Sequence, residues 1–140
     1  MERGYINITE NDKHDFIVNA KLINGTLWLS KYQMATLFNV YTKTIESLLR
    51  SVFKVGLLKE KEVSQLHPFT NNGHKSEMVL YNFEVVVLVG FRVASLEASA
   101  FRNWFITSFH ECTKLKNMMK AGATTMSIDD LKTVFTVSLN

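Results

Sequence analysis

The residues of this chain best suited to chemistry are basic and hydroxyl side chains that recur at helical spacing between positions 42 and 54. Lys43, Ser47, Arg50 and Lys54 are three or four residues apart, so a helix would place them along one side. The other side would be apolar, with Ile45, Leu48, Leu49, Val52 and Phe53. An exposed face of ammonium, guanidinium and hydroxyl groups can donate hydrogen bonds to phosphates and to base edges. The pattern therefore predicts a surface that reads DNA in the major groove.

A helix-turn-helix over 30–54 is the unit that would position this face. Ser30 and Gln33 have the spacing of a capping box, which predicts the start of a first helix. Asn39 predicts the turn, because asparagine tolerates the left-handed backbone conformation better than most residues. Small Ala35 would let the two helices cross closely. The same spacings fit a helical corner that binds no DNA, and that alternative stays open.

Residues on the outer side of this unit are the predicted contacts with double-stranded DNA. The predicted contacts with base edges are Gln33, Tyr41, Thr42, Lys43, Ser47 and Arg50. The predicted contacts with phosphates are Ser30, Lys31, Lys54, His74 and Lys75. Glu46 is expected on the same face, either accepting from a cytosine amine or solvated. Segment 31–61 has six basic and two acidic residues, a net charge of +4 against +3 for the whole chain.

Two β-hairpins are predicted on either side of this unit. Asn24-Gly25 and Asn72-Gly73 are dipeptides typical of two-residue turns, and they predict hairpins over 16–29 and 63–81. The second hairpin directly follows the reading helix, as the wing of a winged helix-turn-helix does. The fold class is therefore predicted to be α+β, with one winged helix-turn-helix-like domain over 1–122.

Three further helices are predicted after the second hairpin, over 83–94, 96–120 and 123–140. The second of these is amphipathic and would be about 37 Å long, which exceeds what a domain of this size needs. Its far end could reach a second copy, so a homodimer is left open. The last helix is a C-terminal extension of the domain, and a longer protein could continue from there.

Composition argues against several classes of protein. The single cysteine, Cys112, excludes an intrachain disulfide and a cysteine-rich zinc site. His14 has aspartates beside it but no further ligand nearby, so we expect no metal site. No apolar run reaches the ~18 residues of a membrane span, and the N-terminus lacks a signal-peptide core. We expect a cytoplasmic protein without cofactor, membrane contact or small-molecule substrate, and not an enzyme.

Two stretches carry a family resemblance, WLSKYQMATLFNVYTKTI at 28–45 and VLYNFEVVVLVGFRVASLEASAFRNWF at 79–105. With the residues around them, roughly 22–111, they resemble the N-terminal region of the virulence-associated RhuM family of bacteria and their mobile elements. The resemblance implies a DNA-binding transcriptional regulator of a mobile or virulence-associated locus. The arrangement is also similar to the amino-terminal domains of phage antirepressors, which implies a protein-interaction module as the alternative. Tyr41 stands where relatives have a capping Ser or Thr, so Thr42 is the expected substitute cap.

An enzymatic alternative comes from His67-Pro68-Phe69 and the TNNGHK stretch after it, which look like the start of the motif of Fic-type nucleotidyl transferases. In that family a general-base histidine precedes a glycine-rich loop that holds an anion. This chain lacks the acidic residue of the motif and has Lys75 in place of its terminal arginine. A strand in which Pro68 ends the pairing explains the same residues.

Overall fold

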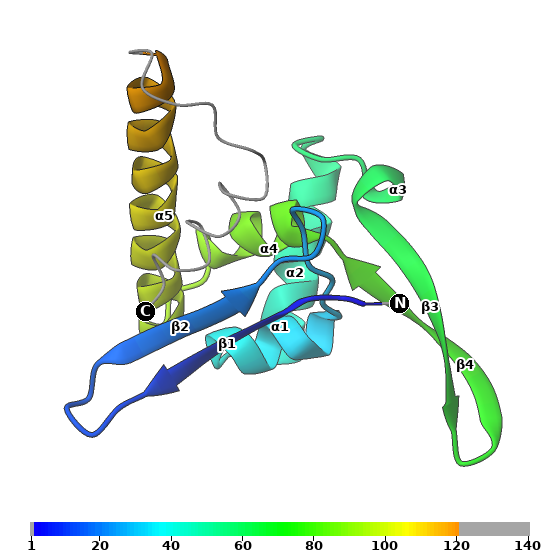
Figure 1. Cartoon of the computed structure of the whole chain (residues 1–140). Coiled ribbons are helices and arrows are strands. Elements are labelled where there is room, and N and C mark those ends of the chain that lie inside the picture. Colours follow the sequence, from blue (N-terminus) through cyan, green and yellow to red (C-terminus); the bar gives the residue numbers. More distant parts are fainter. Residues whose placement is uncertain (1, 121–140) are drawn as a thin grey trace.

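The computed structural model describes residues 2–120, and their side chains through Lys114. The described chain has an α+β fold with five helices and two separate two-stranded antiparallel sheets (Figure 1). The first part runs β1 Tyr5–Glu10, β2 Phe16–Lys21, α1 Lys31–Phe38 and α2 Thr42–Lys54. The second part runs α3 Glu60–Val63, β3 Ser64–Asn71, β4 His74–Tyr81, α4 Phe83–Gly90 and α5 Leu96–Lys120. The predicted α+β class is confirmed, whereas the helical extension predicted over 123–140 lies outside the described residues.

The first hairpin differs from the predicted one over 16–29. Strand β2 pairs with β1, from Tyr5 opposite Lys21 to Glu10 opposite Phe16. The Asn24-Gly25 turn does form, but the only strand pair it closes is Ile23 with Thr26. After this turn the backbone does not pair with β2. The N–H of Trp28 donates to the carbonyl of Arg3, and Leu29 pairs with Tyr81. The alternating sequence YINITE of β1 pairs with β2 at six positions. The short segment that follows the Asn24-Gly25 turn forms no such ladder with β2.

Both helices of the predicted helix-turn-helix form with the turn between them, and only the cap of the second helix differs from the prediction. Ser30 Oγ accepts from the N–H of Gln33 at 3.2 Å, and Gln33 Oε1 accepts from the N–H of Ser30 at 2.9 Å, which completes the capping box. Asn39 ends α1 in the left-handed conformation, with φ 54° and ψ 52°. The prediction that Thr42 caps α2 is wrong. Extended Tyr41 is the N-cap, its carbonyl accepts from Thr44 and Ile45, and its side chain forms no capping hydrogen bond.

The core lies where α1, α2, α4 and α5 meet. Val85, Val86 and Val89 of α4 are fully buried, which follows from the apolar sequence of that helix on nearly all sides. Helix α4 was predicted to continue to position 94, but it ends at Gly90, and Ser95 caps the start of α5 by accepting from the N–H of Ala98 at 3.0 Å. Helix α5 has the predicted bounds and packs against β2, α1 and α4.

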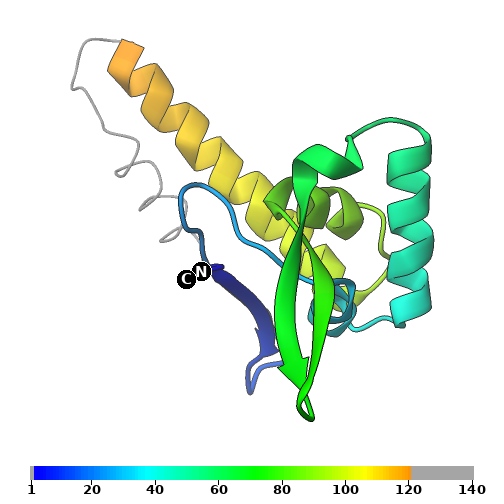
Figure 2. The ribbon, with the colours of Figure 1, turned by 90° about the vertical axis from the view of Figure 1, so that its right-hand side faces the viewer.

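The second hairpin, β3–β4, forms over the predicted range and projects from the body (Figures 1 and 2). Its turn is Asn72-Gly73, with φ of 51° and 81°. Its base is held in two ways. Tyr81 stacks on Phe53 of α2, with ring centroids 6.1 Å apart, and it exchanges two backbone hydrogen bonds with Leu29, of 3.0 and 2.8 Å. The hairpin is thereby fixed both to α2 and to the segment that enters α1.

Candidate nucleic-acid interface

The basic face of α2 is open to solvent. Lys43, Ser47, Arg50 and Lys54 are all exposed, while Ile45, Leu49 and Val52 on the opposite side are buried. Figure 2 shows α2 at the edge of the described structure, in the same part of the molecule as the β3–β4 hairpin. The periodicity of the sequence thus correctly predicted which side of this helix is buried and which is exposed. Charged and hydroxyl groups on the free side can approach a large polyanion without rearrangement of the fold.

The N-terminus of α2 adds positive potential at one end of this face. The N-cap residue, Tyr41, forms no side-chain capping bond, and the first turn of the helix has no acidic residue. Unpaired N–H groups at a helix start attract anions, and Lys43 in the first turn strengthens that attraction. Tyr41, 85% exposed, stands beside this end of the helix, and Thr42 is half-buried.

Lys31 and Glu46 form an ion pair that links α1 to α2. Lys31 Nζ lies 3.0 Å from Glu46 Oε1, and both side chains are about one-third exposed, at 36% and 35%. The hydrogen bond to Glu46 raises the pKa of Lys31 above its usual 10.5. Glu46 was expected to be solvated or to meet a base, whereas the structure turns it towards the start of α1. Sequence spacing gave no signal for this pair, because only the crossing of the two helices brings the residues together.

Two of the predicted contacts are occupied by the helix cap. Ser30 is 5% exposed, and its hydroxyl is used in the capping box, so the predicted phosphate contact of Ser30 is corrected. Gln33 is exposed, but its carboxamide oxygen accepts from the backbone of Ser30 and from the guanidinium of Arg3. Arg3 also donates to the carbonyl of Trp28, at 3.3 and 3.4 Å. Sequence reasoning did not single out Arg3, which is 30 positions from Gln33.

A groove lies beside the contact between α2 and the base of the β3–β4 hairpin, and α1 and α3 also line it. It has a volume of about 620 Å³. Its lining residues are Lys31, Glu46, Leu49, Arg50, Phe53, Lys54, Glu60 and Tyr81. We call it the α2–β4 groove. A smaller hollow of about 380 Å³ adjoins it between the start of α1 and the hairpin, and the two share Lys31 and Tyr81.

The remaining predicted contacts are at the far end of the hairpin. His74 and Lys75 are exposed and lie opposite Asn71 and Thr70, next to the turn. The turn at this end of the β3–β4 hairpin lies away from the helices of the molecule (Figure 1). The structure therefore groups Lys43, Ser47, Arg50 and Lys54 on one helix and places the two hairpin residues on a separate projection.

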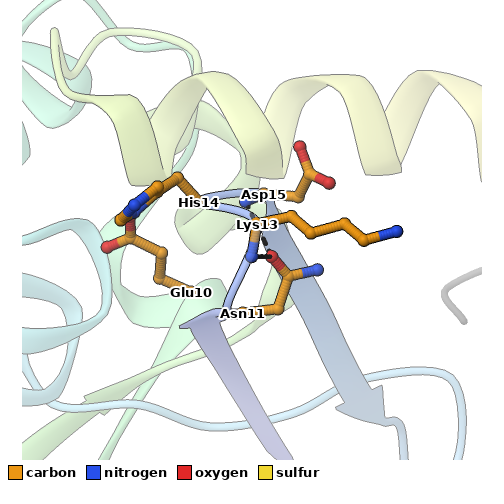
Figure 3. Close-up of polar contacts among 5 residues, drawn as sticks. All are labelled: Glu10, Asn11, Lys13, His14 and Asp15. Atoms are coloured by element: carbon orange, nitrogen blue, oxygen red, sulfur yellow. Dashed lines mark hydrogen bonds and ion pairs between the residues drawn. The ribbon is translucent and has the colours of Figure 1, made fainter.

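The loop between β1 and β2 holds the most conspicuous cluster of polar side chains elsewhere. His14 Nδ1 lies 2.9 Å from Glu10 Oε1, and Asn11 Oδ1 accepts from the backbone of Lys13 and Asp15, at 2.9 Å each (Figure 3). These groups are on the surface, and over residues 2–120 no three His, Cys, Asp or Glu side chains are placed to hold a metal ion. The hydrogen bonds to Asn11 shape the turn between the two strands, and this structural role accounts for the polar side chain at that position.

His67, the residue behind the enzymatic alternative, is half-buried within β3 and lies opposite Met78. The stretch after it continues the strand and forms the hairpin turn. Among the described helices none is long and apolar enough to cross a membrane. Comparison of the chain with protein-family models, with curated proteins and with solved structures found no match.

Proposed function

We propose that this chain is a winged helix-turn-helix module that binds double-stranded DNA, with α2 in the major groove and the β3–β4 hairpin as the wing. The observation that carries the proposal is the uncovered face of α2, where two lysines, an arginine and a serine stand clear of the core that their own helix helps to form. The major groove admits an α-helix, and a hairpin that projects from the same domain can reach the flanking backbone.

Each group of residues has a role in this proposal. Tyr41, Thr42, Lys43, Ser47 and Arg50 approach base edges, together with the free part of the Gln33 carboxamide. The contacts with phosphates come from Lys31, Lys54, His74 and Lys75. Arg3 orients Gln33 by donating a hydrogen bond to its carboxamide oxygen. The family resemblance extends the proposal to transcriptional regulation of a mobile or virulence-associated bacterial locus, in the cytoplasm.

Fluorescence anisotropy with a pool of mixed duplexes tests the proposal. Arg50→Ala and Lys43→Ala should each weaken binding, by about 1–3 kcal/mol where the side chain meets a base edge. With four or five phosphate contacts, log affinity should fall with log salt at a slope near −4. Lys13→Ala removes an equally exposed charge from the β1–β2 loop and should leave the affinity unchanged. Equal binding by all four proteins would contradict the assignment of α2.

A protein-interaction module is the second candidate, and the outer side of α5 favours it. Ile106 and Phe109 are 56% and 64% exposed there, whereas Phe101 and Trp104 on the inner side are buried and Phe105 is half-buried. We propose a second copy of the chain as the partner. Sedimentation equilibrium tests this: Phe109→Ser should lower self-association, whereas Thr113→Ser on the same exposed helix should not. A wild-type chain that stays monomeric at high concentration would contradict it.

A further inference from the structure

The α2–β4 groove contains more positive charge than its neighbours neutralise. Lys31, Arg50 and Lys54 face two carboxylates, Glu46 and Glu60. Glu46 is held by Lys31, and neither Arg50 nor Lys54 forms an ion pair with another residue of the described chain. Arg50 and Lys54 are also part of the exposed face of α2, so the groove opens onto that face. One wall of the groove is therefore cationic and continuous with the proposed reading surface.

The floor of the groove consists of Leu49 and two stacked aromatic rings. Leu49 is 5% exposed, and the rings of Phe53 and Tyr81 are stacked with an interplanar angle of 27°. The backbone bonds between Tyr81 and Leu29 fix this floor to the chain entering α1. A polyanion strand laid in the groove would have its phosphates against the cationic wall and its sugars against the rings. A groove of these dimensions accepts a strand's backbone, not a whole duplex.

We propose that the α2–β4 groove binds one phosphodiester of the DNA backbone through Lys31 and Lys54, and that Glu46 restrains this site by competing for Lys31. The inference rests on the proposed DNA-binding function and assigns a particular site within it. The pair that competes is accessible to solvent, at about one-third exposure of each side chain. Such pairs are weak and exchange readily for a partner of higher charge density.

The exchange has a consequence for the salt dependence of binding. When a phosphate takes Lys31, the released carboxylate of Glu46 gains a cation from solution. That uptake offsets part of the counterion release that drives binding to DNA. Removing the negative charge of Glu46 should abolish the uptake. Glu46 is therefore a positioning residue: it acts through Lys31 and contacts no phosphate itself.

A double-mutant cycle tests the proposal with the full chain and a labelled duplex of mixed sequence, titrated at several salt concentrations. Glu46→Gln should tighten binding by roughly two- to fivefold near ~0.1 M salt and steepen the log–log slope by up to about 0.9. Lys31→Gln should weaken binding. The double variant should bind like Lys31→Gln alone, because Glu46 has nothing to restrain once Lys31 is gone. Lys31→Arg should retain the wild-type response to Glu46→Gln.

Matched controls separate this site from general electrostatics. Glu62→Gln removes the same charge from an exposed position of α3 that does not line the groove, and it should change affinity much less than Glu46→Gln. Thermal melts by circular dichroism confirm that each variant is folded before its affinity is compared. If Glu46→Gln tightens binding equally with and without Lys31, Glu46 acts only as a nearby negative charge, and the groove assignment is overturned.

Two further outcomes distinguish failure of this site from failure of the proposed function. If Lys31→Gln and Glu46→Gln both bind as wild type does while Lys43→Ala, which lies outside the groove lining, binds weakly, the duplex contacts α2 but leaves the groove empty. The groove assignment then falls, and the function stands. If the wild-type chain binds no duplex at any salt concentration, both proposals fall.

Discussion

The carbonyl oxygen of Gly90 accepts a hydrogen bond of 2.9 Å from Nη1 of Arg102, across the corner between α4 and α5. The same nitrogen donates to the carbonyl of Val93 at 2.8 Å. A side chain in the second turn of α5 thus donates to the last carbonyl of α4 and to a carbonyl of the connection between the two helices. Both residues belong to the stretch that carries the family resemblance, and in this structure their roles are architectural.

Arg102→Ala should lower the free energy of unfolding by about 1–3 kcal/mol, because two part-buried carbonyls lose a charged donor. Urea unfolding followed by circular dichroism measures the change. Arg92→Ala is the matched control, since exposed Arg92 bonds only to a carbonyl one turn earlier in its own chain segment. Its stability should stay within about 0.5 kcal/mol of wild type. Equal losses in the two variants would contradict the role of Arg102.

Gly90→Ala should destabilise the fold, although alanine in place of a helical glycine ordinarily stabilises by about 1 kcal/mol. A Cβ at Gly90 would lie 2.6 and 2.7 Å from two ring carbons of Phe101. Overpacking of this kind costs about 1–3 kcal/mol. Phe101→Leu in the same chain should relieve the clash, so the double variant should lose less than the sum of the single losses in urea unfolding. A stabilised Gly90→Ala would contradict the close approach.

Asn39 supports the turn of the helix-turn-helix through its backbone conformation. Asn39→Ala should destabilise by roughly 1 kcal/mol, because a left-handed φ is strained for alanine. Asn39→Gly should be as stable as wild type or more stable, since glycine adopts this conformation freely. Thermal unfolding of the three proteins gives the order. A glycine variant that is less stable than the alanine variant would contradict the role assigned to the left-handed backbone of Asn39.

Stability should fall in alkaline solution above about pH 10. Burial raises the pKa of Tyr81 above its usual 10.0, with Glu60 acting in the same direction and Lys31 against it. The hydrogen bond to Glu46 raises the pKa of Lys31 above 10.5. Both groups therefore hold their protons longer in the folded chain than in the unfolded one. Their contributions are complete below the unfolded pKa values and disappear as the pH rises through the folded ones.

Tyr81→Phe tests one of these two groups separately, because it keeps the ring that stacks on Phe53 and removes only the titrating hydroxyl. The loss of unfolding free energy between about pH 9 and about pH 11 should be smaller in this variant than in wild type. Urea unfolding at each pH gives both values. An undiminished alkaline loss in Tyr81→Phe would assign the effect to other groups.

Local signals in the sequence predicted the local structure well. The capping box at Ser30, the left-handed Asn39 and the Asn72-Gly73 turn each act over a few residues, and all three form. The apolar periodicity of 42–54 likewise identified the buried side of α2. Propensity and spacing suffice when the partners of a group are its neighbours in the chain.

Features that depend on distant partners were missed or misplaced. The Asn24-Gly25 turn forms, but β2 pairs with β1 and not with the segment after the turn. The residues of a turn contain no information about which of two competing segments a strand will pair with. The ion pair of Lys31 with Glu46 and the bond of Arg3 to Gln33 join residues 15 and 30 positions apart. Packing of the helices sets both contacts, and both change which side chains remain free on the candidate interface.

The paired backbone bonds between Leu29 and Tyr81 have a mechanical consequence. They connect the start of α1 to the root of the hairpin, and the Phe53–Tyr81 stack adds α2 to the same junction. Helix and hairpin are therefore aligned when the chain folds, before any ligand arrives. A partner that contacts both the helix and the hairpin meets a preorganised surface. Little conformational entropy of this chain is then lost when the partner binds.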